Sequence, residues 1–163
     1  MTDKKQCLPL TDVENVLAIL NRISILAGFS EEQLHHIFGL LEKVSYKADE
    51  KIFEQGEQPS HIYIVESGRV KLTVSRDNTN LELIVFEAGC LFGEASVIGI
   101  QPHCATAIAV EDTELIVLSR TALLSIYESD TKLFSILILN IAREVCRRLH
   151  ASDKTLLHYV LRE

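Results

Sequence analysis

The spacing of apolar residues changes twice along this chain, and each change predicts a different kind of secondary structure. Apolar residues first recur every three or four positions, as they do on one face of a helix. Alternation with a period of two follows from residue 43 to residue 119, and helical spacing then returns. The pattern predicts helices at both ends of the chain and a strand-rich body between them.

Two helices are expected before the strand-rich body. Thr11 and Asp12 can cap the first, whose apolar residues stand at helical spacing: Val13, Val16, Leu17, Leu20 and Ile23. Ser30 and Gln33 form a capping-box pattern, in which each side chain satisfies a backbone group of the other residue. This pattern opens a second helix with four apolar residues on one face: Leu34, Ile37, Phe38 and Leu41.

Short strands separated by turns are expected in the middle of the chain. Val70, Leu72 and Val74 alternate with polar residues, and residues 81–85 and 105–110 show similar alternation, with Leu81, Leu83 and Val85 on one face. Turn residues punctuate these runs at positions 56–59, 67–68, 77–80 and 88–89. Strands repeating roughly every eight to twelve residues are typical of a closed sandwich or barrel, and two strand-rich halves favour a jelly-roll-like β-roll.

The last 44 residues predict a short helix over residues 120–127 and a long one from about residue 131 to near the end. Within the long helix, residues recur at the four-three spacing of a coiled-coil seam: Ile138, Ala142, Val145, Leu149, Ser152, Leu156 and Tyr159. Two interpretations stay open. The stripe pairs with a second copy of the chain, or the helix packs its apolar face on its own β-roll.

Composition narrows the function without identifying it. The chain has 163 residues and a formal net charge of -7, which disfavours DNA and anionic membranes as partners but allows an anionic ligand in a pocket. No secretory signal is visible, and the longest apolar run, residues 136–141, is too short to span a bilayer. The four cysteines lack CxxC spacing, so we expect reduced thiols in a cytoplasmic protein, with no metal site.

One stretch resembles a known family. Residues 92–107 are similar to the phosphate-binding cassette of cyclic nucleotide-binding domains, because they keep Phe92-Gly93-Glu94 and the Ala105-Thr106 pair. Residues 56–70 look like the family's first hairpin, and Gly89 stands four positions before Gly93, as in the family. The resemblance implies a mostly β fold with flanking helices: a double-stranded β-helix (jelly-roll) β-roll, N-terminal helices and a long C-terminal helix. It divides the chain into an N-terminal helical segment, 1–28, and a cyclic nucleotide-binding-like domain, 29–163.

The resemblance also implies a ligand, cyclic AMP or cyclic GMP, and a set of residues that bind it. Glu94 would accept a hydrogen bond from the ribose 2′-hydroxyl, and backbone N–H groups of the cassette would favour the phosphate. Ser152 falls where helical residues reach the base in the catabolite-activator branch of the family. The candidate ligand-binding residues are Leu72, Phe86, Gly93, Glu94, Ala95, Ser96, His103, Cys104, Ala105 and Ser152.

His103 is the point of departure, because the family has an arginine there that pairs with the cyclic phosphate. A histidine offers fewer donors and is mostly neutral at pH 7. A charge-assisted hydrogen bond is worth roughly 1.5–3 kcal/mol, so its loss predicts binding weaker by about ten- to a few-hundred-fold. The alternative for His103 is a solvated loop histidine beside a pocket that no longer binds anything.

Three functions are compatible with these residues. The first is a non-enzymatic regulatory sensor of cyclic nucleotides, and the second is a ligand-independent interaction scaffold with the same fold. The third, a metal enzyme on a cupin-like barrel, is disfavoured because no histidine pair has HxH or HxxxH spacing. Transcription factors of the family continue into a helix-turn-helix, whereas this sequence stops at Glu163, so direct DNA binding is not expected. The output would run through a homodimer formed by the C-terminal helix, or through an unidentified effector protein.

Overall fold

A computed structural model describes residues 5–11, 23–76 and 79–161 of the chain. The first helix expected from the sequence falls mainly on residues 12–22, outside the described residues. In the part that is described, no helix combines the length and the apolarity that crossing a bilayer requires.

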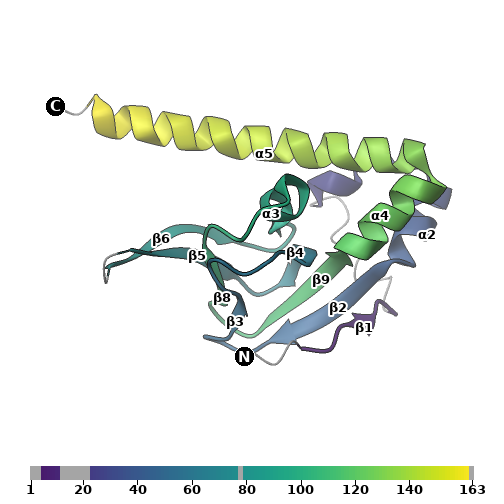
Figure 1. Cartoon of the computed structure of the whole chain (residues 1–163), viewed down its shortest axis with the longest axis horizontal. Coiled ribbons are helices and arrows are strands. Elements are labelled where there is room, and N and C mark those ends of the chain that lie inside the picture. The colour runs from purple at the N-terminus through teal and green to yellow at the C-terminus, as the bar shows by residue number, and fades with distance from the viewer. Residues whose placement is uncertain (1–4, 12–22, 77–78, 162–163) are drawn as a thin grey trace.

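Two antiparallel sheets form the body of the molecule (Figure 1). The first has the order β1 (Leu8–Pro9), β2 (Leu41–Tyr46), β9 (Thr113–Ser119), β4 (His61–Ser67) and β7 (Leu91–Phe92). The second has the order β3 (Lys51–Phe53), β8 (Thr106–Ala109), β5 (Val70–Arg76) and β6 (Thr79–Phe86). The β-roll predicted from the alternating runs is confirmed.

Each face of the first sheet belongs to a different core, and β4 illustrates this. Tyr63 and Val65 pack in the core that the two sheets share, with Phe86 and Phe92. Ile62 and Ile64 point the other way, into a core shared with the helices. Successive side chains of a strand point to opposite faces, so a strand that is buried on both faces is apolar at nearly every position.

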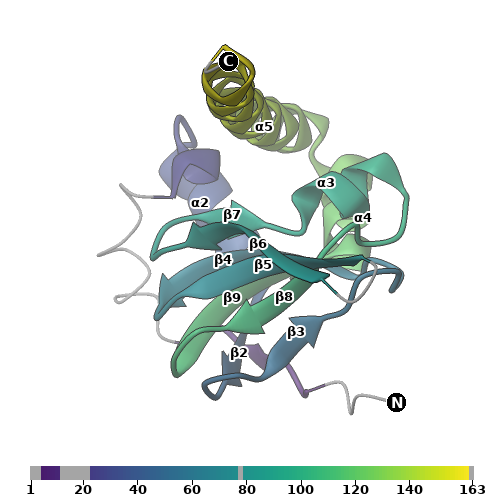
Figure 2. The same ribbon diagram turned by 90° about the vertical axis from the view of Figure 1, so that its left-hand side faces the viewer.

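The helices cover the outer face of the first sheet and one end of the roll. They are a 3₁₀ turn η2 (Ser24–Leu26) and the helices α2 (Glu31–Phe38), α3 (Glu94–Gly99), α4 (Arg120–Ser129) and α5 (Thr131–Val160). Ser30 caps α2 as predicted, since its hydroxyl accepts from Gln33 N at 3.3 Å and its own N–H donates to Gln33 Oε1 at 3.0 Å. Figures 1 and 2 show α5 running above α3 and the sheets, with its C-terminal end projecting past the body.

The helix expected in the N-terminal segment, 1–28, falls outside the described residues, so that expectation stays a prediction. The described part of this segment contains the strand β1, which pairs with β2. Its apolar residues share one core with α2, α4 and α5: Leu10, Ile23, Ile25 and Leu26. A two-residue strand carries too few positions to show alternation, which explains why the sequence did not predict it.

One strand departs from simple alternation. Leu72 pairs with Ile84, but the next residue of β5, Thr73, pairs with Glu82, so Leu83 is an extra residue in β6. The expectation that Leu81, Leu83 and Val85 share a face is therefore wrong. Beyond a β-bulge of this kind, each side chain points to the opposite face of the sheet from the one that simple alternation predicts. The shift aligns Phe86 with Val70, and both side chains are buried between the sheets.

Gly68 should tolerate no side chain. It has a φ of +81°, and a Cβ would lie 2.5 Å from Thr113 Oγ1 and 2.6 Å from the Asp112 carbonyl oxygen. The left-handed backbone and the overpacking together predict that Gly68→Ala lowers the free energy of unfolding by about 2–4 kcal/mol. Gly56→Ala is the matched control, because Gly56 has a φ of +91° with no atom within 4 Å of a Cβ. Gly56→Ala should therefore lower the free energy of unfolding only by the cost of a left-handed backbone, about 1–2 kcal/mol. If urea unfolding showed equal losses of stability for Gly68→Ala and Gly56→Ala, the predicted clash at Gly68 would be contradicted.

Candidate functional site

The turn between β7 and α3 places a carboxylate inside the protein. Gly93 precedes α3 with a φ of +80°, and a Cβ there would lie 2.9 Å from the Tyr63 ring, so the chain turns here against an aromatic side chain. The next residue, Glu94, begins the helix and is only 2% exposed. A buried carboxylate is costly unless it is paired, so the groups around it decide whether the position is stable.

The partner of Glu94 comes from the long C-terminal helix. Arg148 Nη2 donates to Glu94 Oε1, and Arg148 Nη1 donates to the Leu91 carbonyl oxygen at 3.1 Å. The guanidinium carbon also lies 5.5 Å from the centre of the Phe86 ring. One arginine thus joins α5 to β7, to α3 and to the end of β6. The sequence led us to expect Ser152 of this helix in the site, and Arg148, which lies one turn earlier, was missed.

The second oxygen of Glu94 is left without a donor. Among the described residues, no hydrogen-bond partner reaches the buried Oε2 atom. Buried polar atoms are nearly always hydrogen-bonded, and an unsatisfied one costs about 1–3 kcal/mol. A ligand hydroxyl group donating to Glu94 Oε2 would remove this cost.

His103 is buried, so the interpretation of it as a solvated loop histidine is wrong. Its side chain is 4% exposed, and its ring stacks on Phe53 with centroids 3.7 Å apart and an interplanar angle of 8°. Its backbone N–H donates to the Glu57 carbonyl oxygen at 2.9 Å, and its carbonyl accepts from Gly56 N–H at 2.8 Å. Burial lowers the pKa of His103, although the nearby Glu57 opposes the shift. The imidazole is therefore neutral at pH 7.

The other candidate residues divide by burial. Ala105 and Ser96 are buried, Gly93 and Leu72 are half-buried, and Phe86 is 3% exposed in a stack with Phe92 at 5.5 Å. By contrast, three candidates are exposed: Ala95, Cys104 and Ser152. Phe86 and Glu94 are brought together by their shared contact with Arg148, while His103 belongs to the aromatic group around Phe53. A ligand-binding role for each of these residues stays a prediction.

Comparison with known proteins identifies the family. The sequence model of one protein family, the cyclic nucleotide-binding domain, matches residues 43–130, more than half of the chain. The chain belongs to this family. The cyclic AMP receptor protein of Thermus thermophilus is 30% identical over 127 residues, which cover 77% of this chain and 57% of that protein. The cAMP-dependent protein kinase regulatory subunit of Dictyostelium discoideum is 33% identical over 100 residues, covering 60% and 30% respectively.

Solved structures agree with this assignment. The catabolite activator protein of Thermus thermophilus matches this cyclic nucleotide-binding domain with a TM-score of 0.73 and 28% identity, covering 84% of this chain and 63% of that chain. A cyclic nucleotide-binding domain from Methylobacillus flagellatus matches with a TM-score of 0.83, covering 94% and 88%; at 22% identity it supports the fold alone. The chain spans less than two thirds of the curated relatives that it matches.

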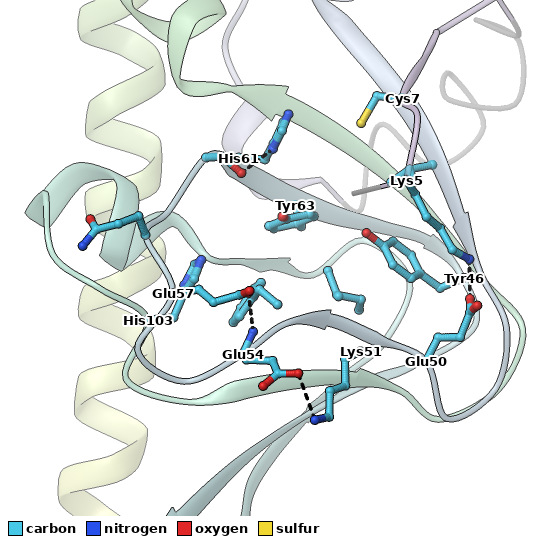
Figure 3. A pocket seen from close by; sticks show the side chains of 15 residues that line it. Lys5, Cys7, Tyr46, Glu50, Lys51, Glu54, Glu57, His61, Tyr63 and His103 are labelled. Atoms are coloured by element: carbon cyan, nitrogen blue, oxygen red, sulfur yellow. Dashed lines mark hydrogen bonds and ion pairs between the residues drawn. The ribbon is translucent and has the colours of Figure 1, made fainter. Parts of the chain in front are cut away.

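The cyclic nucleotide-binding domain also contains a cavity of about 430 Å³ that His103 helps to line (Figure 3). Its lining includes Cys7, Tyr46, His61 and Tyr63, and of the ten candidate ligand-binding residues it contains His103 alone. Burial raises the pKa of Tyr46 to about 12 and also raises that of Tyr63. Glu94 is not among the lining residues, so the cavity is separate from the cassette carboxylate.

Proposed function

We propose that this chain is a non-enzymatic regulatory module that binds cyclic AMP or cyclic GMP between the cassette and α5. The observation that carries the proposal is the buried Glu94 carboxylate with an unsatisfied Oε2 atom at the position where the family binds the ribose. A ribose 2′-hydroxyl would donate to this atom. Family membership supports the ligand class, and the proposal does not distinguish adenine from guanine.

Arg148 would supply the positive charge that the cassette lacks at position 103. It already lies in the site, held by Glu94 and by the Leu91 carbonyl. An anionic phosphate entering beside it would compete with Glu94 for the guanidinium, whose planar donors suit phosphate oxygens. Because part of this attraction replaces an existing ion pair, we expect weak binding, micromolar or poorer.

Calorimetric titration tests the proposal. The wild-type protein should bind cyclic AMP or cyclic GMP in preference to 5′-AMP, whose phosphate is not cyclised. Glu94→Gln should weaken binding by about tenfold or more, because a charged acceptor contributes roughly 1.5–3 kcal/mol to a hydrogen bond. Glu87→Gln is the control, since Glu87 is an exposed residue of the turn after β6. Absence of binding to both nucleotides at millimolar concentration would favour the ligand-independent scaffold.

Restoring the family arginine should strengthen binding. We expect His103→Arg to raise the affinity for the cyclic nucleotide by about tenfold, because a two-pronged charge-assisted contact replaces a neutral ring. The side chain must leave the Phe53 stack to do so, and circular dichroism would show whether the fold survives. Glu94→Ala in this background should abolish the gain. An unchanged affinity in folded His103→Arg would contradict a phosphate position beside residue 103.

The C-terminal helix supports a second part of the proposal, assembly into a homodimer. The first half of α5 packs on its own domain, with Leu133, Leu137 and Ile141 fully buried. The later residues of the heptad stripe are exposed: Leu149 is 59% exposed, Leu156 is 63% exposed and Tyr159 is 68% exposed. Exposed apolar side chains at seam spacing favour pairing with a second copy, and an effector protein is the other candidate for this surface.

A further inference from the structure

Three potential metal ligands meet where β2 and β4 lie near the chain that leads into β1, and Glu94 is not one of them. They are Cys7, Glu42 and His61, and one ligand atom from each lies within 4.8 Å of those of the other two. All three residues are half-buried. Cys7 and His61 also line the 430 Å³ cavity, and Figure 3 shows both side chains along the same side of it.

Strand register explains why the three residues converge. Pro9 of β1 pairs with Glu42 of β2, so Cys7, two positions before Pro9, faces the same side of the sheet as Glu42. Val117 of β9 pairs with Glu42 on one side and with Tyr63 of β4 on the other. His61 stands two positions before Tyr63, which places it on that same face.

We propose that Cys7, Glu42 and His61 bind a divalent transition-metal ion, with zinc as the ion that this donor set fits. Thiolate, imidazole and carboxylate are the three ligand types of protein zinc sites, whereas magnesium and calcium take oxygen ligands. Zinc bonds of about 2.0–2.3 Å set the ligand atoms roughly 3.3–3.7 Å apart in a tetrahedron. The side chains therefore have to close by about 1 Å, a movement within the reach of side-chain rotation.

Two further features fit the site. The Ser60 hydroxyl lies 2.8 Å from His61 Nδ1, and contacts of this kind orient histidine rings in metal sites. The cavity provides room for a water molecule or a small solute as the fourth ligand, which a three-residue zinc site requires. The expectation of no metal site rested on motif spacing within one segment. Here the ligands come from three separate elements, so no motif could reveal them.

Cobalt binding tests the proposal directly. Reduced, chelator-treated protein would be titrated with Co²⁺, whose thiolate charge-transfer and tetrahedral d–d bands report coordination, and then with Zn²⁺ in competition. The ligand variants are Cys7→Ser, Glu42→Gln and His61→Gln. The matched controls are Cys146→Ser and His36→Gln, which change an exposed thiol on α5 and an exposed imidazole on α2.

Wild-type protein and both controls should bind one ion per chain with a tetrahedral cobalt spectrum and a raised melting temperature, because a ligand that binds the native state stabilises it. Each ligand variant should weaken binding at least tenfold, and Cys7→Ser should lose the charge-transfer band. Zn²⁺ should also slow alkylation of Cys7 in the wild-type chain, a readout that needs no variant to fold. Absence of tetrahedral cobalt, unprotected Cys7, or binding unchanged in folded His61→Gln would overturn the proposal.

Discussion

Arg148→Leu should lower the free energy of unfolding by about 3 kcal/mol, a drop of roughly 6–12 °C in the melting temperature. The substitution leaves the Glu94 carboxylate, which is 2% exposed, without its charged partner. Removing one member of a buried ion pair typically costs 3–5 kcal/mol. We expect the lower end of this range because the Arg148 side chain is 27% exposed and already partly solvated.

The neighbouring arginine provides the control. Arg147 pairs with Glu144 on the surface, and its side chain is 60% exposed, so Arg147→Leu should cost less than about 1 kcal/mol. Urea unfolding of both variants measures the difference. Adding Glu94→Gln to Arg148→Leu should recover part of the lost stability, because a neutral amide replaces the stranded charge. Equal losses for the two arginine variants would show that the Glu94 pair is not a buried interaction in solution.

Leu149→Glu combined with Leu156→Glu should convert a homodimer into a folded monomer. In a parallel pairing of α5 helices, each new carboxylate would face its counterpart across an apolar seam. Like charges brought together at an interface cost several kcal/mol, so the dimer dissociation constant should rise at least about 100-fold. The folded state should be retained, since both leucines are more than half exposed in the single chain.

Leu139→Glu is the matched control for the seam. Leu139 is 55% exposed on the same helix but lies outside the four-three stripe. Sedimentation velocity should show a dimer for the wild type and Leu139→Glu, and a monomer for the double variant. A wild type that remains monomeric at high concentration would contradict the homodimer and leave the stripe to an effector protein.

Local signals predicted much of this fold. Ser30 and Gln33 marked the start of α2, alternation marked β5, and glycines at positions 56, 68 and 89 marked turns, where the structure gives each of them a positive φ. These features depend on residues within a few positions of one another. The family motif singled out Glu94, which the structure buries at the start of α3.

The remaining features depend on residues that are distant in sequence. Arg148 and Glu94 are 54 positions apart, and nothing in either segment specifies that they meet. The Phe53 stack that buries His103 forms through packing between distant segments rather than through a motif. The bulge at Leu83 is a further case, because a single inserted residue leaves the local pattern looking regular.

The Arg148–Glu94 link has a thermodynamic consequence for signalling. If the nucleotide phosphate and Glu94 compete for the Arg148 guanidinium, occupancy of the pocket and the position of the helix share a coupling free energy, and such coupling acts equally in both directions. A partner that binds α5 while Arg148 is paired with Glu94 would weaken nucleotide binding. The nucleotide would weaken binding of that partner by the same factor. A partner that holds α5 with the guanidinium released from Glu94 but still in the pocket would instead strengthen nucleotide binding, so the cellular response threshold would depend on which protein holds the helix.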